Sequence, residues 1–218
     1  MIVTINKKAN FWIRLLATII DLILFVVFAL ATSFIVFNYK KADFYTNQLL
    51  YKELIYRFWL LSLILFLVLT YIVFPILTKG KTIGMLICKI KVILTNKNIK
   101  LSKAIFDRQR LFSFLWIFVF IAFMLMSTDA FLKATRGKNL NNVEKVVFAL
   151  PVTLATIALG LDLFMIITGA GATRVSWNDK FSQTRTVWIN KFEEIIEEEN
   201  INKKIYPKKR ELPNISIL

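Results

Sequence analysis

The sequence lacks histidine entirely and contains a single cysteine, Cys88. These absences exclude zinc and iron–sulfur sites built from His and Cys within one chain, and they exclude Cys–His nucleophiles. An intrachain disulfide is excluded as well. We interpret Cys88 as a small apolar filler, and we expect neither a metal centre nor a cofactor.

Glycine is also scarce, with six residues scattered along the chain. Loops that cradle phosphates need glycines at fixed spacing, and neither a Walker-type loop nor a dinucleotide-binding fingerprint is present. The HExxH and GxSxG patterns of metalloproteases and hydrolases are absent too. Because nothing in the sequence marks a nucleophile or a metal, we expect that the protein is not an enzyme.

Apolar residues, by contrast, make up 57% of the chain, with 20 Phe and a mean hydropathy of +0.60. A soluble core of this size does not need so much apolar material. A helix of about 20 apolar residues crosses the roughly 30 Å of a bilayer core. We therefore predict an all-α membrane protein with four transmembrane helices. The predicted spans are 15–37, 58–78, 111–129 and 146–168.

The net charge is +15, and the basic residues lie between the apolar runs. Of the 29 Lys and Arg, 21 lie in the N-terminal segment, the loop 79–110 and the C-terminal tail, and 8 lie in the other two loops. The positive-inside rule then predicts that both termini are cytoplasmic. The same placement indicates contact with anionic lipid headgroups rather than with nucleic acid.

The cytoplasmic segments are predicted to form a small cap of interfacial helices and a short β element. In the basic loop, residues 85–90 suit a short interfacial helix, and residues 92–101 surround an Asn-Lys-Asn turn typical of a hairpin. Ser176 and Asp179 have the spacing of a capping box. Residues 190–205 resemble an amphipathic helix, and the chain beyond is expected to be disordered.

Two carboxylates fall inside predicted spans, Asp21 in the first and Asp162 in the fourth. At 1.5 Å per helical residue, both lie roughly 10 Å from the cytoplasmic side. Placing a carboxylate in hydrocarbon costs about 2.5–3.5 kcal/mol, so each needs a partner, a proton or water. Two facing carboxylates repel each other when ionised, which favours a shared proton or a cation between them.

A purely structural role for Asp21 is the alternative. Arg14 lies seven residues earlier, two helical turns away on nearly the same face. Asp21 could then pair with Arg14, or accept hydrogen bonds from Thr18 or from another helix. Asp162 could reach the cytoplasmic interface by tilt of its helix. Asp179, outside the spans, is either a helix-start residue or a ligand.

Three segments carry a family resemblance. The first, FWIRLLATIIDLILF, holds Arg14 and Asp21; the second, GKTIGMLICKIKVI, follows the second span; the third, SWNDKFSQTRTVWI, holds Asp179. In this order they resemble the motifs of the RDD family of small bacterial membrane proteins, named for one arginine and two aspartates. Further positions that match the motifs are Gly80, Thr82, Gly84, Lys180 and Thr184. Met85 replaces a basic residue, Cys88 a small one and Gln183 a glycine.

The resemblance covers residues 14–189 and leaves 1–13 and 190–218 as cytoplasmic flanks. It implies a multi-pass protein of the bacterial cytoplasmic membrane and suggests transport, including cation/proton exchange. If the protein is such a transporter, the depth of Asp21 and Asp162 in the predicted helices places them on the path of a monovalent cation and a proton. Four spans are few for alternating access, so we expect a homo-oligomer or a partner membrane protein. The alternative is a non-transporting scaffold or assembly protein whose basic cap binds lipids or a partner.

Two contacts are predicted at the cytoplasmic surface. Arg14 or a nearby lysine should pair with Asp179, which would attach the tail to the first helix. The segments KIKVI (89–93) and TRTVWI (184–189) should lie close together as a small sheet.

Overall fold

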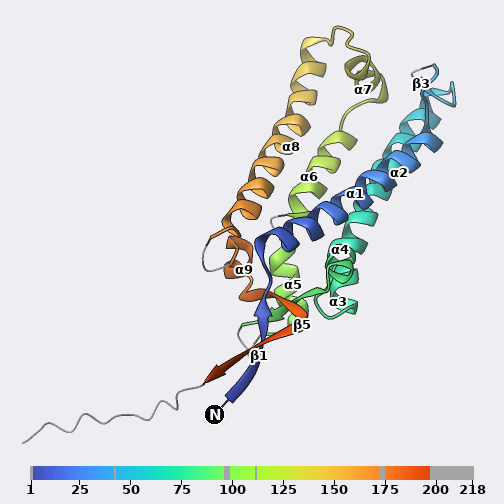
Figure 1. The fold of residues 1–218 in the computed structure, drawn as a ribbon. Helices are drawn as coiled ribbons and strands as arrows, with labels where there is room; N and C mark the ends of the chain where they lie inside the picture. The colour runs from blue at the N-terminus through green and yellow to red at the C-terminus, as the bar shows by residue number, and fades with distance from the viewer. Residues whose placement is uncertain (1, 42, 96–98, 111, 172–174, 197–218) are drawn as a thin grey trace, which may run out of the picture.

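The protein is described by a computed structural model that covers residues 2–41, 43–95, 99–110, 112–171 and 175–196 (Figure 1). Four helices, α1, α2, α6 and α8, form the body, and they pack in that order. Short helices and a three-stranded sheet gather at one end of this bundle, near the N-terminus (Figure 1). The helix α7 and a two-stranded β ribbon lie at the other end.

Three helical segments are long and apolar enough to cross a membrane, and a fourth span results if a pair of helices bent by 103° counts as one. The three are α1, the segment from α2 to α3, and α8, whereas the bent pair is α6 and α7. The chain is therefore a mostly helical, multi-pass membrane protein. The bounds are α1 (Phe11–Val36), α2 (Leu49–Val68), the π-helical segment η1 (Leu69–Val73), α3 (Phe74–Leu77), α6 (Ser113–Met124), α7 (Thr128–Thr135) and α8 (Asn142–Thr168).

The predicted third span, 111–129, is wrong as one continuous helix. After α6 the chain turns, and α7 starts at Thr128 because side chains cap its first amides. Ser127 is the N-cap residue. Glu53 of α2 accepts hydrogen bonds from both the amide and the hydroxyl of Thr128, at 2.8 and 2.9 Å. The break therefore depends on a long-range contact that helical periodicity does not reveal.

Two prolines lie near departures from the predicted spans. The helix α8 starts earlier than predicted because Asn141 and Glu144 form a capping box at its N-terminus. Pro151 consequently lies inside the helix rather than in its first turns. Pro75 is the second residue of α3, just after η1. It lacks an N–H and so leaves a carbonyl of η1 without the usual helical donor, in keeping with the π-helical segment there.

Four short elements build the end of the bundle that carries the sheet. A short helix, α4, lies near the one predicted over 85–90, but it starts two residues earlier and ends three residues earlier, because Ile90 already belongs to β4. Its N-cap residue Thr82 accepts a hydrogen bond from the amide of Met85 at 3.2 Å. The predicted hairpin is wrong, since its first arm pairs with the C-terminal strand and Leu101 begins α5; residues 96–98 lie outside the described residues. The bounds are α4 (Ile83–Ile87), β4 (Ile90–Leu94), α5 (Leu101–Gln109) and α9 (Trp177–Phe181).

The sheet has the order β1-β5-β4, with β1 (Ile2–Lys8) and β5 (Thr184–Ile196), and both pairs are antiparallel. Val92 pairs with Thr186 in the register, so the predicted contact between KIKVI and TRTVWI is confirmed. The strand β1 was not predicted. It pairs with β5 as far as Ile196, so the predicted helix from 190 is wrong up to that residue, and its remainder lies outside the described residues.

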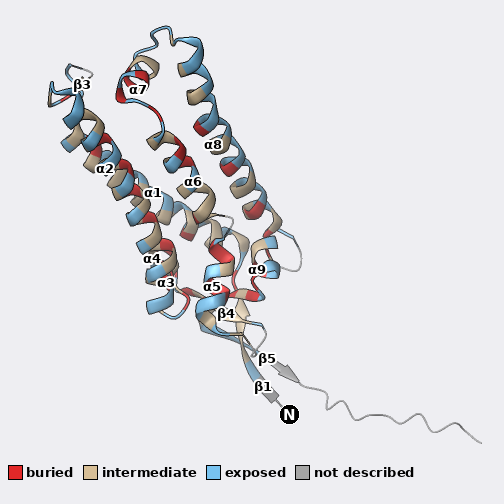
Figure 2. Ribbon diagram, turned by 180° about the vertical axis from the view of Figure 1, so that it is seen from behind, coloured by how far each residue is buried: buried red, intermediate tan, exposed pale blue. Residues whose placement is uncertain are grey.

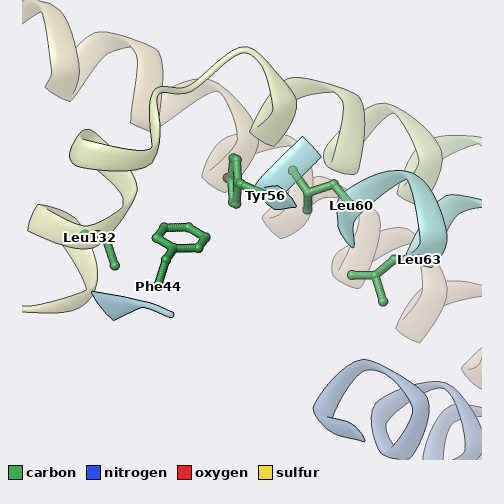
Figure 3. Packing of buried hydrophobic residues seen from close by; sticks show 5 residues of the cluster. All are labelled: Phe44, Tyr56, Leu60, Leu63 and Leu132. Atoms are coloured by element: carbon green, nitrogen blue, oxygen red, sulfur yellow. The ribbon is translucent and has the colours of Figure 1, made fainter. Parts of the chain in front are cut away.

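Buried side chains form two apolar clusters. Figure 3 shows the larger, Phe44, Tyr56, Leu60, Leu63 and Leu132, which joins α2, α7 and the β ribbon of β2 (Phe37–Asn38) and β3 (Asp43–Phe44). Outside these clusters, the outward faces of α1, α2 and α8 are exposed along much of their length (Figure 2), and many of their exposed side chains are large and apolar. Such exposed apolar faces suit contact with lipid.

Cys88 belongs to the second cluster, with Ala9, Ala17 and Ile90. It is a free, buried cysteine at the end of α4. Burial raises the pKa of its thiol, and the nearby charge of Asp21 adds to this effect. The thiol therefore stays protonated and unreactive, as its interpretation as an apolar filler requires.

Candidate functional site

One buried carboxylate, Asp179 of α9, binds two arginines. Arg14 of the first turn of α1 donates to its Oδ2, and Arg108 of the last turn of α5 donates to its Oδ1. The side chain of Asp179 is 1% exposed, and those of the arginines are 12% and 10% exposed. The predicted contact of Arg14 with Asp179 is thus confirmed, and it joins the tail to the first helix.

Hydroxyl groups complete this ion cluster. The guanidinium of Arg108 donates to Thr184 at 3.0 Å and to Thr186 at 3.3 Å, both on β5. Arg14 donates to the Ser176 hydroxyl at 3.0 Å. Thr184, the family threonine, therefore positions Arg108.

Asp179 has the predicted capping-box role as well. Its amide donates to the Ser176 hydroxyl, and its carboxylate accepts from the Ser176 amide, both at 3.2 Å. Burial disfavours the ionised form, but the guanidiniums of Arg108 and Arg14 and these hydrogen bonds outweigh it and lower the pKa of the Asp179 carboxyl. Asp179 is therefore an ionised structural ligand that joins α1, α5 and α9.

Sequence reasoning missed Arg108 because it lies in the basic loop that suggested a lipid-facing surface. A signal was present, since Ala104 and Ile105 lie one helical turn before Arg108 and share its face. Both are buried, which directs the arginine inward. Lys180, by contrast, is exposed, and its side chain makes no hydrogen bond or ion pair within the part of the chain that is described.

Asp21 pairs with α4 rather than with Arg14. Its Oδ2 accepts a hydrogen bond from the Thr82 hydroxyl at 2.6 Å, and its Oδ1 accepts one from the Gly84 amide at 2.7 Å. The Thr18 hydroxyl instead donates to the carbonyl of Arg14 at 3.0 Å. Of the alternatives for Asp21, the structure therefore shows hydrogen bonding to another helix.

The family glycines have structural reasons. A Cβ on Gly84 would overlap the carbonyl oxygen of Ala17 and lie 3.0 Å from the Asp21 carboxyl carbon, so only glycine lets α4 approach α1 this closely. Gly80 has a φ of +90°, and its carbonyl accepts from the Val92 amide at 2.9 Å. Gln183, where the family has a glycine, also adopts a positive φ, of 50°.

Asp162 is bound differently. The indole Nε1 of Trp116, on α6, donates to its Oδ2 at 2.8 Å. Its Oδ1 makes no hydrogen bond to any of the residues that the structure describes. Asp162 is thus held to the neighbouring helix at one oxygen only.

A single cavity brings the two intramembrane carboxylates together. Its volume is about 120 Å³, several times what one water molecule requires. It extends from the Arg14–Asp179–Arg108 ion cluster to the level of Asp21 and Asp162. The other residues that line it include Phe11, Thr18, Tyr71, Met85, Gln109, Phe112, Met165 and Asn178. Among the described residues, no group of three or more His, Cys, Asp and Glu side chains could hold a metal ion.

Comparison with known proteins gives one match. A search of curated proteins found no similar sequence, and a search of solved structures found no similar structure. The sequence profile of the RDD family matches residues 8–183, which contain every helix of the described residues and the ion cluster apart from Thr184 and Thr186. The chain therefore belongs to the RDD family.

Proposed function

We propose that the protein is a secondary transporter, or a transporter subunit, that exchanges a monovalent cation for a proton across the bacterial cytoplasmic membrane. The observation that carries this proposal is the cavity shared by Asp21 and Asp162. Intramembrane carboxylates are costly and commonly mark ion or proton paths. Here neither of the two contacts a cationic side chain among the described residues, and both line a space that can hold water or an ion.

The charges around the cavity support a monovalent ligand. Arg14 and Arg108 provide two positive charges, while Asp21, Asp162 and Asp179 provide three negative charges when ionised. One proton or one monovalent cation would therefore neutralise the group. Exchange of the proton for the cation keeps the net charge around the cavity at zero in both states. A neutral site has a lower electrostatic cost in the membrane than a charged one.

The proposed topology has four spans, with the bent pair α6–α7 as the third, and both termini and the cap in the cytoplasm. The excess of Lys and Arg at the sheet end supports this orientation. Both carboxylates then lie near the cytoplasmic side, since Asp162 comes six residues before the end of α8. A helix as short as α6 spans roughly 18 Å, which favours a second copy or a partner protein around it.

The proposal is tested with purified protein in liposomes that contain a pH-sensitive dye. Na⁺, K⁺ or Li⁺ is added outside, and the internal pH is followed for the wild type and for the double variant Asp21→Asn/Asp162→Asn. Cation-dependent proton flux in the wild type that the double variant lacks supports exchange. Equal, cation-independent leak in both proteins would contradict it.

A second candidate function is a non-transporting scaffold that binds lipids or a partner through its basic cap. The observation that favours it is the hydrogen bonding of both Asp21 oxygens by α4. Under this function the motif residues would only build the fold, and the wild type would show no cation-dependent proton flux. Loss of the cap lysines would weaken the binding of the protein to anionic vesicles. We assign the protein no enzymatic reaction under either function.

A further inference from the structure

We infer that Asp162, with Tyr71 lining the same cavity, is the group that binds and releases the exchanged ion, whereas Asp21 anchors α4. This inference rests on the proposed exchange function and divides the roles of its two carboxylates. Asp162 lies outside the three family motifs, so the resemblance does not lead to it. The argument rests on the hydrogen bonds and burial of the two aspartates and of Tyr71.

Asp21 is less open to an ion than Asp162, since α4 already engages one of the two lone pairs on each of its oxygens. Each of its oxygens accepts a hydrogen bond, from Thr82 at 2.6 Å and from Gly84 at 2.7 Å. The contact is close, because a Cβ on Gly84 would overlap the backbone of Ala17. A cation that took over these lone pairs would have to detach α4 from α1. The two hydrogen bonds and the close packing indicate a fixed structural ligand.

Asp162 has the opposite pattern. One oxygen accepts the indole N–H of Trp116 at 2.8 Å, which fixes the orientation of the carboxylate. The other oxygen has no hydrogen-bond partner in the described part of the chain. Asp162 also lines the cavity, so this oxygen belongs to a group that water or an ion can reach. A carboxylate held at one oxygen and open at the other suits reversible ion binding.

Tyr71 provides a second, independent observation. It is only 8% exposed, it lines the same cavity, and its hydroxyl has no hydrogen-bond partner among the residues described. The ring of Tyr71 packs against that of Phe112, with 5.1 Å between the ring centroids. Phe112 lies one helical turn before Trp116, whose amide donates to the Phe112 carbonyl. Because the described residues leave this hydroxyl without a partner, it is available to hydrogen-bond water or a ligand in the cavity. Tyr71 can therefore provide its hydroxyl oxygen to a cation held in the cavity.

The remaining charged groups on the cavity are already accounted for. Arg14 and Arg108 are both bound to Asp179, and Asp21 is bound to α4. From α6, the helix packed most closely on α8, Trp116 faces Asp162 with a neutral indole. The cavity is large enough for several waters, so the ligand that fits is a small monovalent cation that keeps part of its hydration shell.

Four single variants in proteoliposomes test the inference. Asp162→Asn should abolish cation-dependent proton flux. Asp21→Asn is isosteric and keeps one acceptor for α4, so it should retain flux, with the half-saturating cation concentration raised a few-fold by loss of a negative charge. Tyr71→Phe should raise that concentration several-fold and leave the maximal rate nearly unchanged. Asp129→Asn, at an exposed position of α7 that does not line the cavity, is the matched control and should behave as the wild type.

A binding measurement guards against misfolded variants. Trp116 donates to Asp162, so its fluorescence should change when Na⁺ or K⁺ is titrated into the detergent-solubilised protein. The change should persist in Asp21→Asn and disappear in both Asp162→Asn and Trp116→Phe. Asp162→Glu, which keeps the charge, should restore part of the flux.

The outcomes separate the two levels of the proposal. Flux that survives in Asp162→Asn but is lost in Asp21→Asn would overturn the division of roles while leaving exchange in place. A wild type without any cation-dependent flux would overturn the exchange function, and this inference with it.

Discussion

Asp21 accepts a hydrogen bond from the amide of Gly84 at 2.7 Å, 63 residues further along the chain. This contact joins the first helix to the short helix α4 and closes one side of the cavity. It links two of the family motifs, because the aspartate of the first motif accepts hydrogen bonds from the threonine and the second glycine of the next motif.

The closeness of α4 to α1 predicts a specific sensitivity at Gly84. Gly84→Ala places a methyl group against the Ala17 carbonyl, so we expect a loss of about 1–3 kcal/mol in stability from overpacking. Gly160→Ala is the control, since no atom lies within 4 Å of its added Cβ. Thermal unfolding in detergent measures both; equal midpoints would show that the close contact is absent.

The Thr82 hydroxyl donates to Asp21 and accepts from the Met85 amide. Thr82→Val keeps the shape but leaves a carboxylate oxygen and an amide without partners, at a cost of about 1–3 kcal/mol. Thr82→Ser keeps the hydroxyl and should be close to the wild type. Chemical denaturation of the two variants tests this, and an equal loss in both would attribute the effect to the methyl group instead.

The ion cluster predicts an order of destabilisation. Asp179→Asn leaves two buried guanidiniums without a counter-charge and should cost about 3–5 kcal/mol. Arg108→Gln should cost less, because Arg14 still pairs with Asp179. Lys7→Gln is the control, since its ion pair with Glu193 is exposed on both sides and contributes about 0–1 kcal/mol. Unfolding midpoints in another order would contradict the role assigned to Asp179.

The lowered pKa of Asp179 gives the cluster a pH dependence. A carboxyl whose folded pKa lies below its unfolded value, about 3.9, stabilises the fold fully above that value and loses the effect as the pH falls through the folded pKa. The difference in unfolding midpoint between the wild type and Arg108→Gln should therefore be constant from pH 7 to about 5 and shrink below about pH 4. A difference that grows on acidification would have the wrong sign.

Several features could be predicted from the sequence because they depend on local patterns. Apolar runs located α1, α2 and α8, and the spacing of Ser176 and Asp179 indicated the capping box of α9. KIKVI and TRTVWI are rich in β-branched residues, and the distribution of Lys and Arg predicted that both lie on the same side of the membrane. These two features indicated the pairing of β4 with β5. The contact of Arg14 with Asp179 followed from the same placement.

Other features depend on contacts between distant residues and left no local signal. The break between α6 and α7 is stabilised by Glu53, from another helix, so an apolar run resembled one span. The start of the tail is a strand rather than a helix because the backbone of β1 pairs with Phe192 and its neighbours. Asp21 has its partners at the start of α4, 61 and 63 residues away, whereas Arg14, the nearer candidate in sequence, binds Asp179.

The central claim is that the carboxylates on the cavity exchange a cation for a proton. The most direct measurement is the initial rate of internal pH change in proteoliposomes after a Na⁺ pulse, for the wild type and the Asp21→Asn/Asp162→Asn variant at equal protein content. The account predicts a saturable, cation-dependent rate in the wild type that is lost in the variant. Identical, non-saturable rates in the two proteins would contradict it.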